Sequence, residues 1–286
     1  MVHSMSTLAG KTELGFILQN LDVNNLTNQQ VKLIKESVLR YGLVVLPRQT
    51  ITPKILEDFT KKIGDIVKLS PLTSAGEHED SCENVVRVSN ILKDGSIVPN
   101  RYTATNWHTD GDFWSSPKNH IWNILYGECI PEEGGDTIFA DCERAYHELT
   151  NEEKESLRHK KIIVSSANLP NIKSPTHTET TSNTPQTNLV AEHEILATHP
   201  VSGKKHLYVS GPEQAIQISG CNKEESLKEM RRLHKHILKP QNIYIHEWKK
   251  GDLIIWDNLM SVHKGHGNYG NQPRLLYKTQ VRVTSL

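Results

Sequence analysis

The stretch TNWHTDGDFW, residues 105–114, places a histidine and an aspartate two positions apart, as His108 and Asp110. In an extended segment, residues two apart point to the same side, so the imidazole and the carboxylate could meet at one point. Both groups bind divalent metals. An H-x-D pair also occurs in ordinary solvated turns, so a metal site requires a third ligand from elsewhere in the chain.

A second set of polar residues follows the apolar run LIIW near the C-terminus, in GDLIIWDNLMSVHKGHGNYGNQPRLLYKTQV. The run predicts a buried strand over Leu253–Trp256 that ends in a polar turn and delivers His263, and Arg274 stands eleven residues further on. Two imidazoles and one carboxylate on one face of a metal leave three positions open, which suits an iron(II) that binds a co-substrate and oxygen together. A structural zinc site needs four protein ligands, usually including sulfur. The planar fork of Arg274 could hold the far end of a dicarboxylic acid that chelates the metal.

The motifs WHTD, GGDT and WDNLMSVH, followed by Arg274, resemble those of the taurine/2,4-dichlorophenoxyacetate dioxygenase (TauD/TfdA) family of iron(II)/2-oxoglutarate oxygenases. The likeness runs from YGLVVLP to YKTQVRV and includes THPVSGKKHLYVS, with the motifs in the family's order. The resemblance implies a double-stranded β-helix, or jelly-roll, core. It also implies Fe(II), 2-oxoglutarate as co-substrate, and O2.

Carried over residue by residue, the resemblance assigns the metal to His108, Asp110 and His263. It assigns the far carboxylate of 2-oxoglutarate to Arg274 and Thr137. Phe113 falls where the family places an aromatic ring beside the substrate. His266 competes with His263, since HKGH offers both, and the spacing from WDN favours His263. The other histidines are interpreted as surface or helix residues, among them His120, His147, His234 and His236.

The substrate side departs from the taurine enzymes, which use a second arginine four residues after the first. Lys278 occupies that position here, and Ser70 stands where the family has a histidine before a proline. Residues an even number apart share a face of a strand, so Lys278 should point inward with Arg274. A buried ammonium needs an anionic partner, which predicts a substrate with an anionic group; the alternative is a lysine facing solvent. The stretch VSNILKDGSIVPN looks nearer to the aryloxyacetate branch of the family.

The predicted activity is oxidation, most simply hydroxylation, of a small organic molecule with release of succinate and CO2. Desaturation or cyclisation would use the same cofactors. Two other classes are the alternatives: a catalytically silent jelly-roll binding protein, and a metal-dependent hydrolase that uses a bound hydroxide. Neither needs an arginine and a threonine placed for a dicarboxylate. Release of succinate without substrate separates both from a dioxygenase.

The elements that must position these residues are mainly strands, with helices at the edges. Helices are predicted at TNQQVKLIKESVLRYG, where Thr27 and Gln30 form a capping box and Gly42 ends the helix, and at TPKILEDFTKKIG. From about Asn84 onward short β-rich runs dominate, interrupted by one helix near NKEESLKEMRRLHKHIL, which Asn222 caps. Many short strands without βαβ alternation predict a barrel or jelly roll.

Composition limits the other possibilities. The 286 residues contain 33 Lys+Arg and 33 Asp+Glu, a balance that argues against a broad basic field for nucleic acid. No run approaches the roughly 20 apolar residues of a membrane span, and the first residues lack the apolar run of a signal peptide. A cytoplasmic protein with reduced thiols is expected, with no nucleic-acid or membrane partner and homo-oligomerisation left open. The scattered cysteines match no zinc or redox spacing: Cys82, Cys129, Cys142 and Cys221.

One segment differs in composition from the rest of the predicted single domain of residues 1–286. The insertion at about 165–190, SSANLPNIKSPTHTETTSNTPQTN, is rich in Ser, Thr, Asn and Pro. It has few large apolar groups with which to order itself. Insertions of this kind serve as active-site lids or are disordered, and both alternatives apply here.

Overall fold

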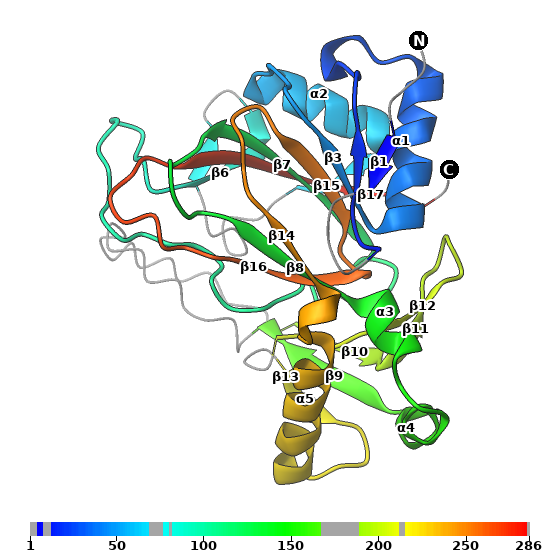
Figure 1. Cartoon of the computed structure of the whole chain (residues 1–286). Coiled ribbons are helices and arrows are strands. Elements are labelled where there is room, and N and C mark those ends of the chain that lie inside the picture. Colours follow the sequence, from blue (N-terminus) through cyan, green and yellow to red (C-terminus); the bar gives the residue numbers. More distant parts are fainter. Residues whose placement is uncertain are drawn as a thin grey trace.

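The computed structural model describes residues 5–7, 13–68, 77–79, 82–166, 189–211 and 215–284. Within them the chain is mainly β, with helices at the edges (Figure 1). The major sheet has the order β1-β2-β3-β15-β7-β17-β6-β5, with β4 paired to β17. Its strands are β1 (Met5–Thr7), β2 (Phe16–Leu18), β3 (Leu43–Leu46), β4 (Asp65–Ile66), β5 (Glu77–Glu79), β6 (Cys82–Ser89), β7 (Ile121–Cys129), β15 (Leu253–Asp257) and β17 (Leu275–Arg282).

A minor sheet faces it, with the order β14 (Ile243–His246), β8 (Thr137–Asp141) and β16 (Ser261–Gly265). The two sheets share a core: Leu125 and Leu276 of the major sheet belong to one buried cluster with Phe139 and Tyr244 of the minor sheet. Side chains on the two inner faces of stacked sheets interdigitate in this way in a β-sandwich. The structure therefore confirms the predicted jelly-roll core.

The alternation along β7 shows why this strand lies centrally. Trp122, Ile124 and Tyr126 point to the outer face and join the cluster under the N-terminal helices. Asn123 and Leu125 point to the inner face, and both are buried. A strand covered on both faces reads as a nearly continuous apolar run, and the one buried amide at Asn123 therefore needs polar partners inside the sandwich.

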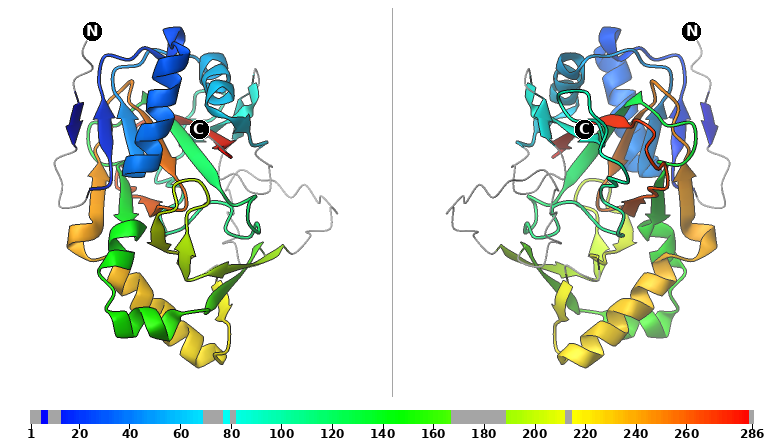
Figure 2. Two further views of the ribbon diagram at one scale, coloured as in Figure 1. Left: turned by 90° about the vertical axis from the view of Figure 1, so that its right-hand side faces the viewer. Right: turned by 90° about the vertical axis from the view of Figure 1, so that its left-hand side faces the viewer.

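The N-terminal helices α1 (Asn28–Tyr41) and α2 (Pro53–Ile63) lie against the major sheet, at the opposite end of the molecule from α5 (Lys223–Ile237) (Figures 1 and 2). The predicted capping box of Thr27 and Gln30 is present, and Gly42 ends α1 with a positive φ of 69°. Asn222 caps α5 as predicted. Local hydrogen-bonding signals fixed these helix ends.

Two short helices depart from the prediction of a single helix in the β-rich part: α3 (Cys142–His147) and α4 (Asn151–Leu157). Thr150 caps α4 in a capping box with Glu153, so the T-x-x-E pattern in the sequence is the local signal for this helix. Short 3-10 helices occur at η1 (Val23–Asn25) and η3 (Pro240–Asn242).

Two smaller sheets complete the part beneath the sandwich. One has the order β10 (Val190–Glu194), β9 (Lys161–Ser165) and β13 (Ala215–Ile218), and the other pairs β11 (Leu196–Thr198) with β12 (Lys205–Leu207). The polar insertion joins β9 to β10, whose ends pair at Ser165 and Val190. The lid expected around 175–187 lies outside the described residues, and the single-domain organisation stays a prediction. Among the described helices, none has the length and apolarity that crossing a membrane requires.

Candidate metal and co-substrate site

The H-x-D segment lies outside the named strands but is attached to one of them. His108 and His263 of β16 form an isolated antiparallel bridge. Each backbone N–H donates to the other residue's carbonyl oxygen at 3.0 Å. The bridge brings the two imidazole rings to a centroid distance of 4.3 Å. A two-residue backbone contact thus joins segments that are far apart in the sequence.

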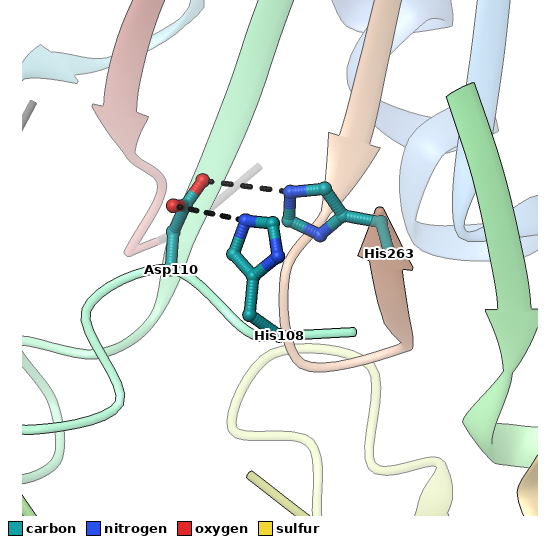
Figure 3. A group of neighbouring side chains, drawn as sticks. All are labelled: His108, Asp110 and His263. Atoms are coloured by element: carbon teal, nitrogen blue, oxygen red, sulfur yellow. Dashed lines mark ion pairs between the residues drawn. The ribbon is translucent and has the colours of Figure 1, made fainter. Parts of the chain in front are cut away.

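Three metal-binding atoms converge at this bridge (Figure 3). The Nε2 atoms of His108 and His263 lie 3.8 and 3.7 Å from the Asp110 carboxylate oxygens, and the ligand atoms of all three residues lie within 4.8 Å of one another. His108 Nδ1 lies 2.8 Å from the Asn106 carbonyl oxygen. Because a carbonyl only accepts, Nδ1 carries the proton and Nε2 keeps its lone pair. The donor set fits a divalent metal held by two histidines and one carboxylate.

The electrostatics keep these groups in their metal-binding forms. Burial would raise the pKa of Asp110, but the ammonium of Lys278 and the two imidazoles outweigh burial and hold that pKa well below its usual range. Burial, together with the His108 imidazole beside it, holds the pKa of His263 well below its usual value. An ionised carboxylate and a neutral imidazole are the forms that coordinate metals.

Lys278 points inward, as strand alternation predicted. Its Nζ donates to Asp110 Oδ2 at 2.6 Å. The anionic partner that an inward-pointing ammonium requires is therefore supplied by the protein itself, and the partial burial of Lys278 alone no longer demands an anionic substrate. The sequence could not show this, because Asp110 reaches Lys278 from a loop 168 positions away.

His263 and His266, the two candidates for the third ligand, lie in different surroundings. His266 lies beside Asp136, with Nδ1 3.2 Å from Oδ2, and its side chain is exposed. The structure therefore brings His263, and not His266, to His108 and Asp110.

Arg274, at the start of β17, is buried next to the GGDT turn. Its Nε and Nη2 donate to the Gly135 carbonyl oxygen at 3.1 and 2.8 Å. Gly134 and Gly135 both have positive φ, and a Cβ on Gly135 would lie 2.9 Å from Arg274 Nε. The paired glycines thus let the backbone approach the guanidinium closely, and they hold one edge of its fork.

Thr137 begins β8 directly after this turn and is buried. Its Oγ1 accepts a hydrogen bond from Trp248 Nε1 at 2.9 Å. With the indole as donor, the threonine hydroxyl proton remains available to another acceptor. Phe113 is also buried, with its ring edge-to-face on Trp114 at 5.2 Å; its place beside a substrate stays a prediction. Ser70 lies outside the described residues.

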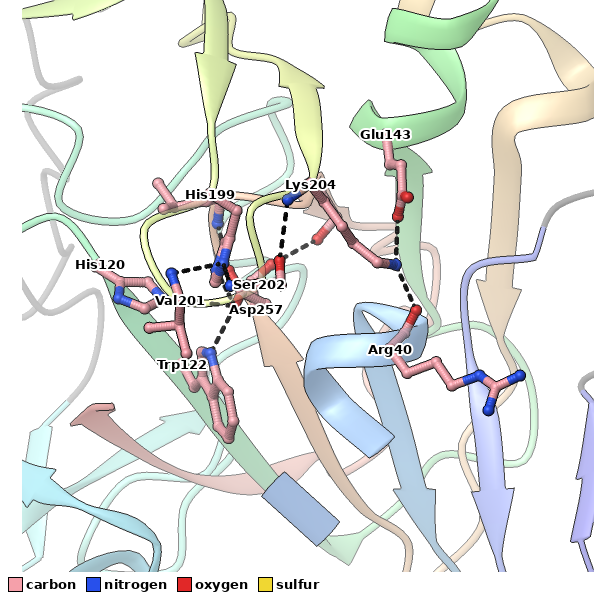
Figure 4. A network of polar contacts seen from close by, with 11 residues as sticks. Arg40, His120, Trp122, Glu143, His199, Val201, Ser202, Lys204 and Asp257 are labelled. Carbon is pink, nitrogen blue, oxygen red and sulfur yellow. Dashed lines mark hydrogen bonds and ion pairs between the residues drawn. The ribbon is translucent and has the colours of Figure 1, made fainter. Parts of the chain in front are cut away.

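A second group of two histidines and one aspartate lies nearby: His120, His199 and Asp257 (Figure 4). The interpretation of His120 as a surface or helix residue is wrong, because it is buried beside Asp257, with Nε2 3.7 Å from Oδ2. The carboxylate accepts hydrogen bonds from Trp122 Nε1 at 2.6 Å and from Leu259 N at 2.9 Å.

The proton positions distinguish this group from the first. The backbone amides of Val201 and Ser202 donate to His199 Nδ1 at 3.3 and 3.0 Å. Nδ1 is therefore the acceptor nitrogen, and Nε2 carries the proton that it donates to Asp257 Oδ2 at 2.9 Å. Burial would raise the pKa of Asp257, but His199 and His120 outweigh it and hold that pKa far below its usual range. The group is a hydrogen-bonded network that ties β15 to β7 and to the turn between β11 and β12.

A jelly roll with two histidines and a carboxylate on one face defines a class of metal-dependent oxygenases. The chain belongs to the family described as taurine catabolism dioxygenase TauD, TfdA family, whose profile matches residues 8–280. Alpha-ketoglutarate-dependent dioxygenases of this family use Fe(II), 2-oxoglutarate and O2, which confirms the predicted family and cofactor set.

Three curated relatives show the range of the family. An alkylsulfatase of Acinetobacter baylyi is 29% identical over 60% of this chain, and the match spans 55% of that protein. The alpha-ketoglutarate-dependent 2,4-dichlorophenoxyacetate dioxygenase of a Burkholderia species is 25% identical over 73% of this chain and 69% of its own. Pentalenolactone F synthase of Streptomyces arenae is 30% identical over 79% of this chain and 78% of its own.

A crystal structure also shares the fold over nearly the whole chain. AAD-2 in complex with Mn(II) and N-oxalylglycine superposes with a TM-score of 0.77 at 26% identity. The match covers 98% of this chain and 97% of AAD-2.

Proposed function

We propose that this chain is an Fe(II)/2-oxoglutarate-dependent dioxygenase that hydroxylates a small organic molecule carrying an anionic group, with release of succinate and CO2. The observation that carries the proposal is the convergence of His108, Asp110 and His263, with the lone pair of His108 Nε2 free for a metal. Family membership supports the same chemistry. Desaturation or cyclisation of the substrate would use the same site.

In this proposal His108, Asp110 and His263 hold the iron. The bound iron, together with 2-oxoglutarate and O2, supplies the oxidation of a substrate C–H bond coupled to decarboxylation of the co-substrate. The chain's own residues position the reactants. Arg274 presents the part of its fork that Gly135 does not use to the far carboxylate of 2-oxoglutarate. Thr137 adds the hydroxyl proton that its bond from Trp248 leaves available.

The anionic group on the substrate is supported by two observations. The relatives include a 2,4-dichlorophenoxyacetate dioxygenase and an alkylsulfatase, and both names denote acidic substrates. The Lys278 ammonium carries three N–H donors, and its bond to Asp110 uses one. Lys278 can therefore hold Asp110 and still contact an anion, while Phe113 supplies an aromatic wall after the H-x-D turn.

The matched pair His263→Ala and His266→Ala tests the chemistry. Succinate released from 2-oxoglutarate in the presence of Fe(II) is measured for each variant without added substrate. Loss of a residue that supports a metal ligand typically lowers activity by roughly 10–100-fold. We expect His263→Ala, which removes a ligand itself, to lower succinate release by at least that factor. We expect His266→Ala to release succinate as the wild type does. Retained activity in His263→Ala, or no succinate from the wild-type protein, would overturn the proposal.

The same assay tests the substrate class. A panel of small carboxylates, sulfate esters and neutral analogues is screened for compounds that couple oxygen uptake to succinate. Lys278→Met keeps the length of the side chain and removes its charge. It should raise the KM for an acidic substrate more than the KM for a neutral analogue, and succinate release without substrate measures separately what the loss of its bond to Asp110 costs the metal site. Coupling by the neutral analogues alone would exclude an anionic substrate.

We also propose a cytoplasmic location and a small molecule as the main partner. All four cysteines lie in the described part of the chain and are free thiols, as is usual in a reducing compartment. The balanced charge supports a small-molecule partner over nucleic acid. A sedimentation measurement would determine whether the protein assembles into a homo-oligomer.

A further inference from the structure

The side chain of Asn258, in the turn between β15 and β16, holds the backbone of a proposed metal ligand. Its Oδ1 accepts a hydrogen bond from the Asp110 backbone N–H at 3.1 Å. Its Nδ2 donates to the Asp110 carbonyl oxygen at 2.5 Å. One buried amide therefore satisfies both backbone polar groups of a residue 148 positions earlier in the chain.

Two further amides fix the orientation of Asn258. Asn123 Nδ2 donates to Asn258 Oδ1 at 3.2 Å, and Gln280 Nε2 donates to Asn123 Oδ1 at 2.7 Å. Asn123 of β7 and Gln280 of β17 stand directly opposite each other in the strand register. Because the Asp110 backbone N–H only donates and its carbonyl only accepts, the Asn258 amide has one orientation there, and the bonds from Asn123 and Gln280 match that orientation. The Asn258 nitrogen must then face the Asp110 carbonyl oxygen.

The three bonded amides, Gln280, Asn123 and Asn258, end at the Asp110 backbone, which the β-bridge does not hold. His108 is fixed by its two backbone bonds to His263, but Asp110 lies two residues further along the loop. Lys278 contacts only the Asp110 carboxylate, and it does so through a long side chain with several rotatable bonds. Among the residues that the structure describes, Asn258 is the one whose side chain bonds both polar groups of the Asp110 backbone and so fixes it relative to the two imidazoles.

We propose that Asn258 is a positioning residue of the metal site, with its amide oriented by Asn123 and Gln280. The proposal rests on the proposed function, because its consequence is the affinity of the site for a divalent metal. Groups that orient metal ligands typically contribute 10–100-fold to that affinity. A role in folding alone would instead change the stability of the metal-free protein and leave the affinity of the folded protein unchanged.

The test measures Mn(II) binding to metal-free protein, by the electron paramagnetic resonance signal of free Mn(II). Circular dichroism and thermal unfolding first establish that each variant is folded. We expect Asn258→Ala to bind Mn(II) about 10–100-fold more weakly than wild type. Asn258→Asp keeps the acceptor for the Asp110 N–H but cannot donate to its carbonyl, so it should bind Mn(II) no better than Asn258→Ala.

Two more variants keep the test decisive. Asn123→Ala removes the group that orients Asn258 and does not touch Asp110, so it should weaken Mn(II) binding in the same direction by a smaller factor. Asn84→Ala is the matched control, since Asn84 is a buried amide on β6 bonded at 2.6 Å to Glu57 of α2. It should bind Mn(II) as wild type does.

The outcomes separate the two proposals. Wild-type affinity in folded Asn258→Ala would overturn the positioning role. If Asn258→Ala does not fold, wild-type affinity in Asn123→Ala would overturn it. Absence of Mn(II) binding by the wild-type protein would instead overturn the proposed function.

Discussion

Two regions of this molecule contain the same three residue types within the same distance, and only one of them is arranged for a metal. A β-bridge joins His108 to His263 in the middle of β16, Asp110 lies two residues after His108, and both loop residues are partly exposed. His120, His199 and Asp257 are buried between β7, β15 and the β11–β12 turn. Each group brings two imidazoles and a carboxylate within 4.8 Å.

The difference lies in what the Nδ1 atom of one histidine in each group contacts, His108 in the first and His199 in the second. A carbonyl oxygen accepts from His108 Nδ1, so Nε2 presents a lone pair to the centre of its group. Backbone amides donate to His199 Nδ1, so Nε2 presents a proton instead. That proton is already donated to Asp257, whose carboxylate also accepts from Trp122 and Leu259. Residue types and spacing therefore do not decide a metal site; the neighbours that set the tautomer do.

The largest expected effect tests this difference directly, with His108→Ala and His120→Ala as the pair. Metal-free wild-type protein should bind one Mn(II) per chain. His108→Ala should lower the affinity for Mn(II) by more than about 100-fold, which exceeds the cost of losing a residue that only supports a metal ligand. His120→Ala, if folded, should keep the stoichiometry and affinity of wild type. Two ions per chain in the wild type, or loss of one of two ions in His120→Ala, would show that the second group binds metal as well.

The second expected effect is on stability, and here substitution in the second group should have the larger effect. Asp257→Ala leaves three buried N–H groups, of Trp122, His199 and Leu259, without their acceptor. An unsatisfied buried donor costs about 1–3 kcal/mol, so the free energy of unfolding should fall by at least about 3 kcal/mol. His108→Ala, at a partly exposed position, should change it by less than about 1 kcal/mol.

Urea unfolding of the metal-free proteins measures both changes. A stability of Asp257→Ala within error of the wild type would contradict the network, because the three donors would then have found other partners.

Much of the first group could be predicted from the sequence, and very little of the second. His108, Asp110, His263 and Arg274 lie in motifs whose order and spacing are shared with a family, and the match confirms that family. Capping boxes such as Thr27 with Gln30 depend on residues three apart, so the sequence contains the whole signal.

The role of His120 depends instead on distant partners. It requires the register of β7 against β15 and the position of the β11–β12 turn, which no local pattern encodes. The same reason applies to Asn258 and to Lys278. Strand alternation predicted that Lys278 points inward, and no local pattern singled out Asn258; the partner of both, Asp110, is set by the tertiary fold.

The smallest expected effect is a pH dependence of stability. It tests whether water is excluded from the second region. His206 of β12 lies beside His199, and both of its ring nitrogens are buried without a hydrogen-bond partner among the described residues. Burial lowers the pKa of His206 to about 4. The unfolded chain takes up this proton near pH 6.5 and the folded protein only near pH 4. The unfolded state therefore binds more protons within this window, and stability falls as pH drops through it. The loss attributable to His206 should reach about 3 kcal/mol, since each pKa unit corresponds to about 1.4 kcal/mol.

His206→Leu removes the titration, so its stability relative to wild type should rise by that amount between about pH 7 and pH 4. His147→Gln, at an exposed position on α3, is the matched control and should follow the wild type. If His206→Leu and wild type lost stability in parallel, His206 would take up its proton as readily in the folded protein as in the unfolded chain. The second region would then be open to water, and its contrast with the first would rest on hydrogen bonding alone.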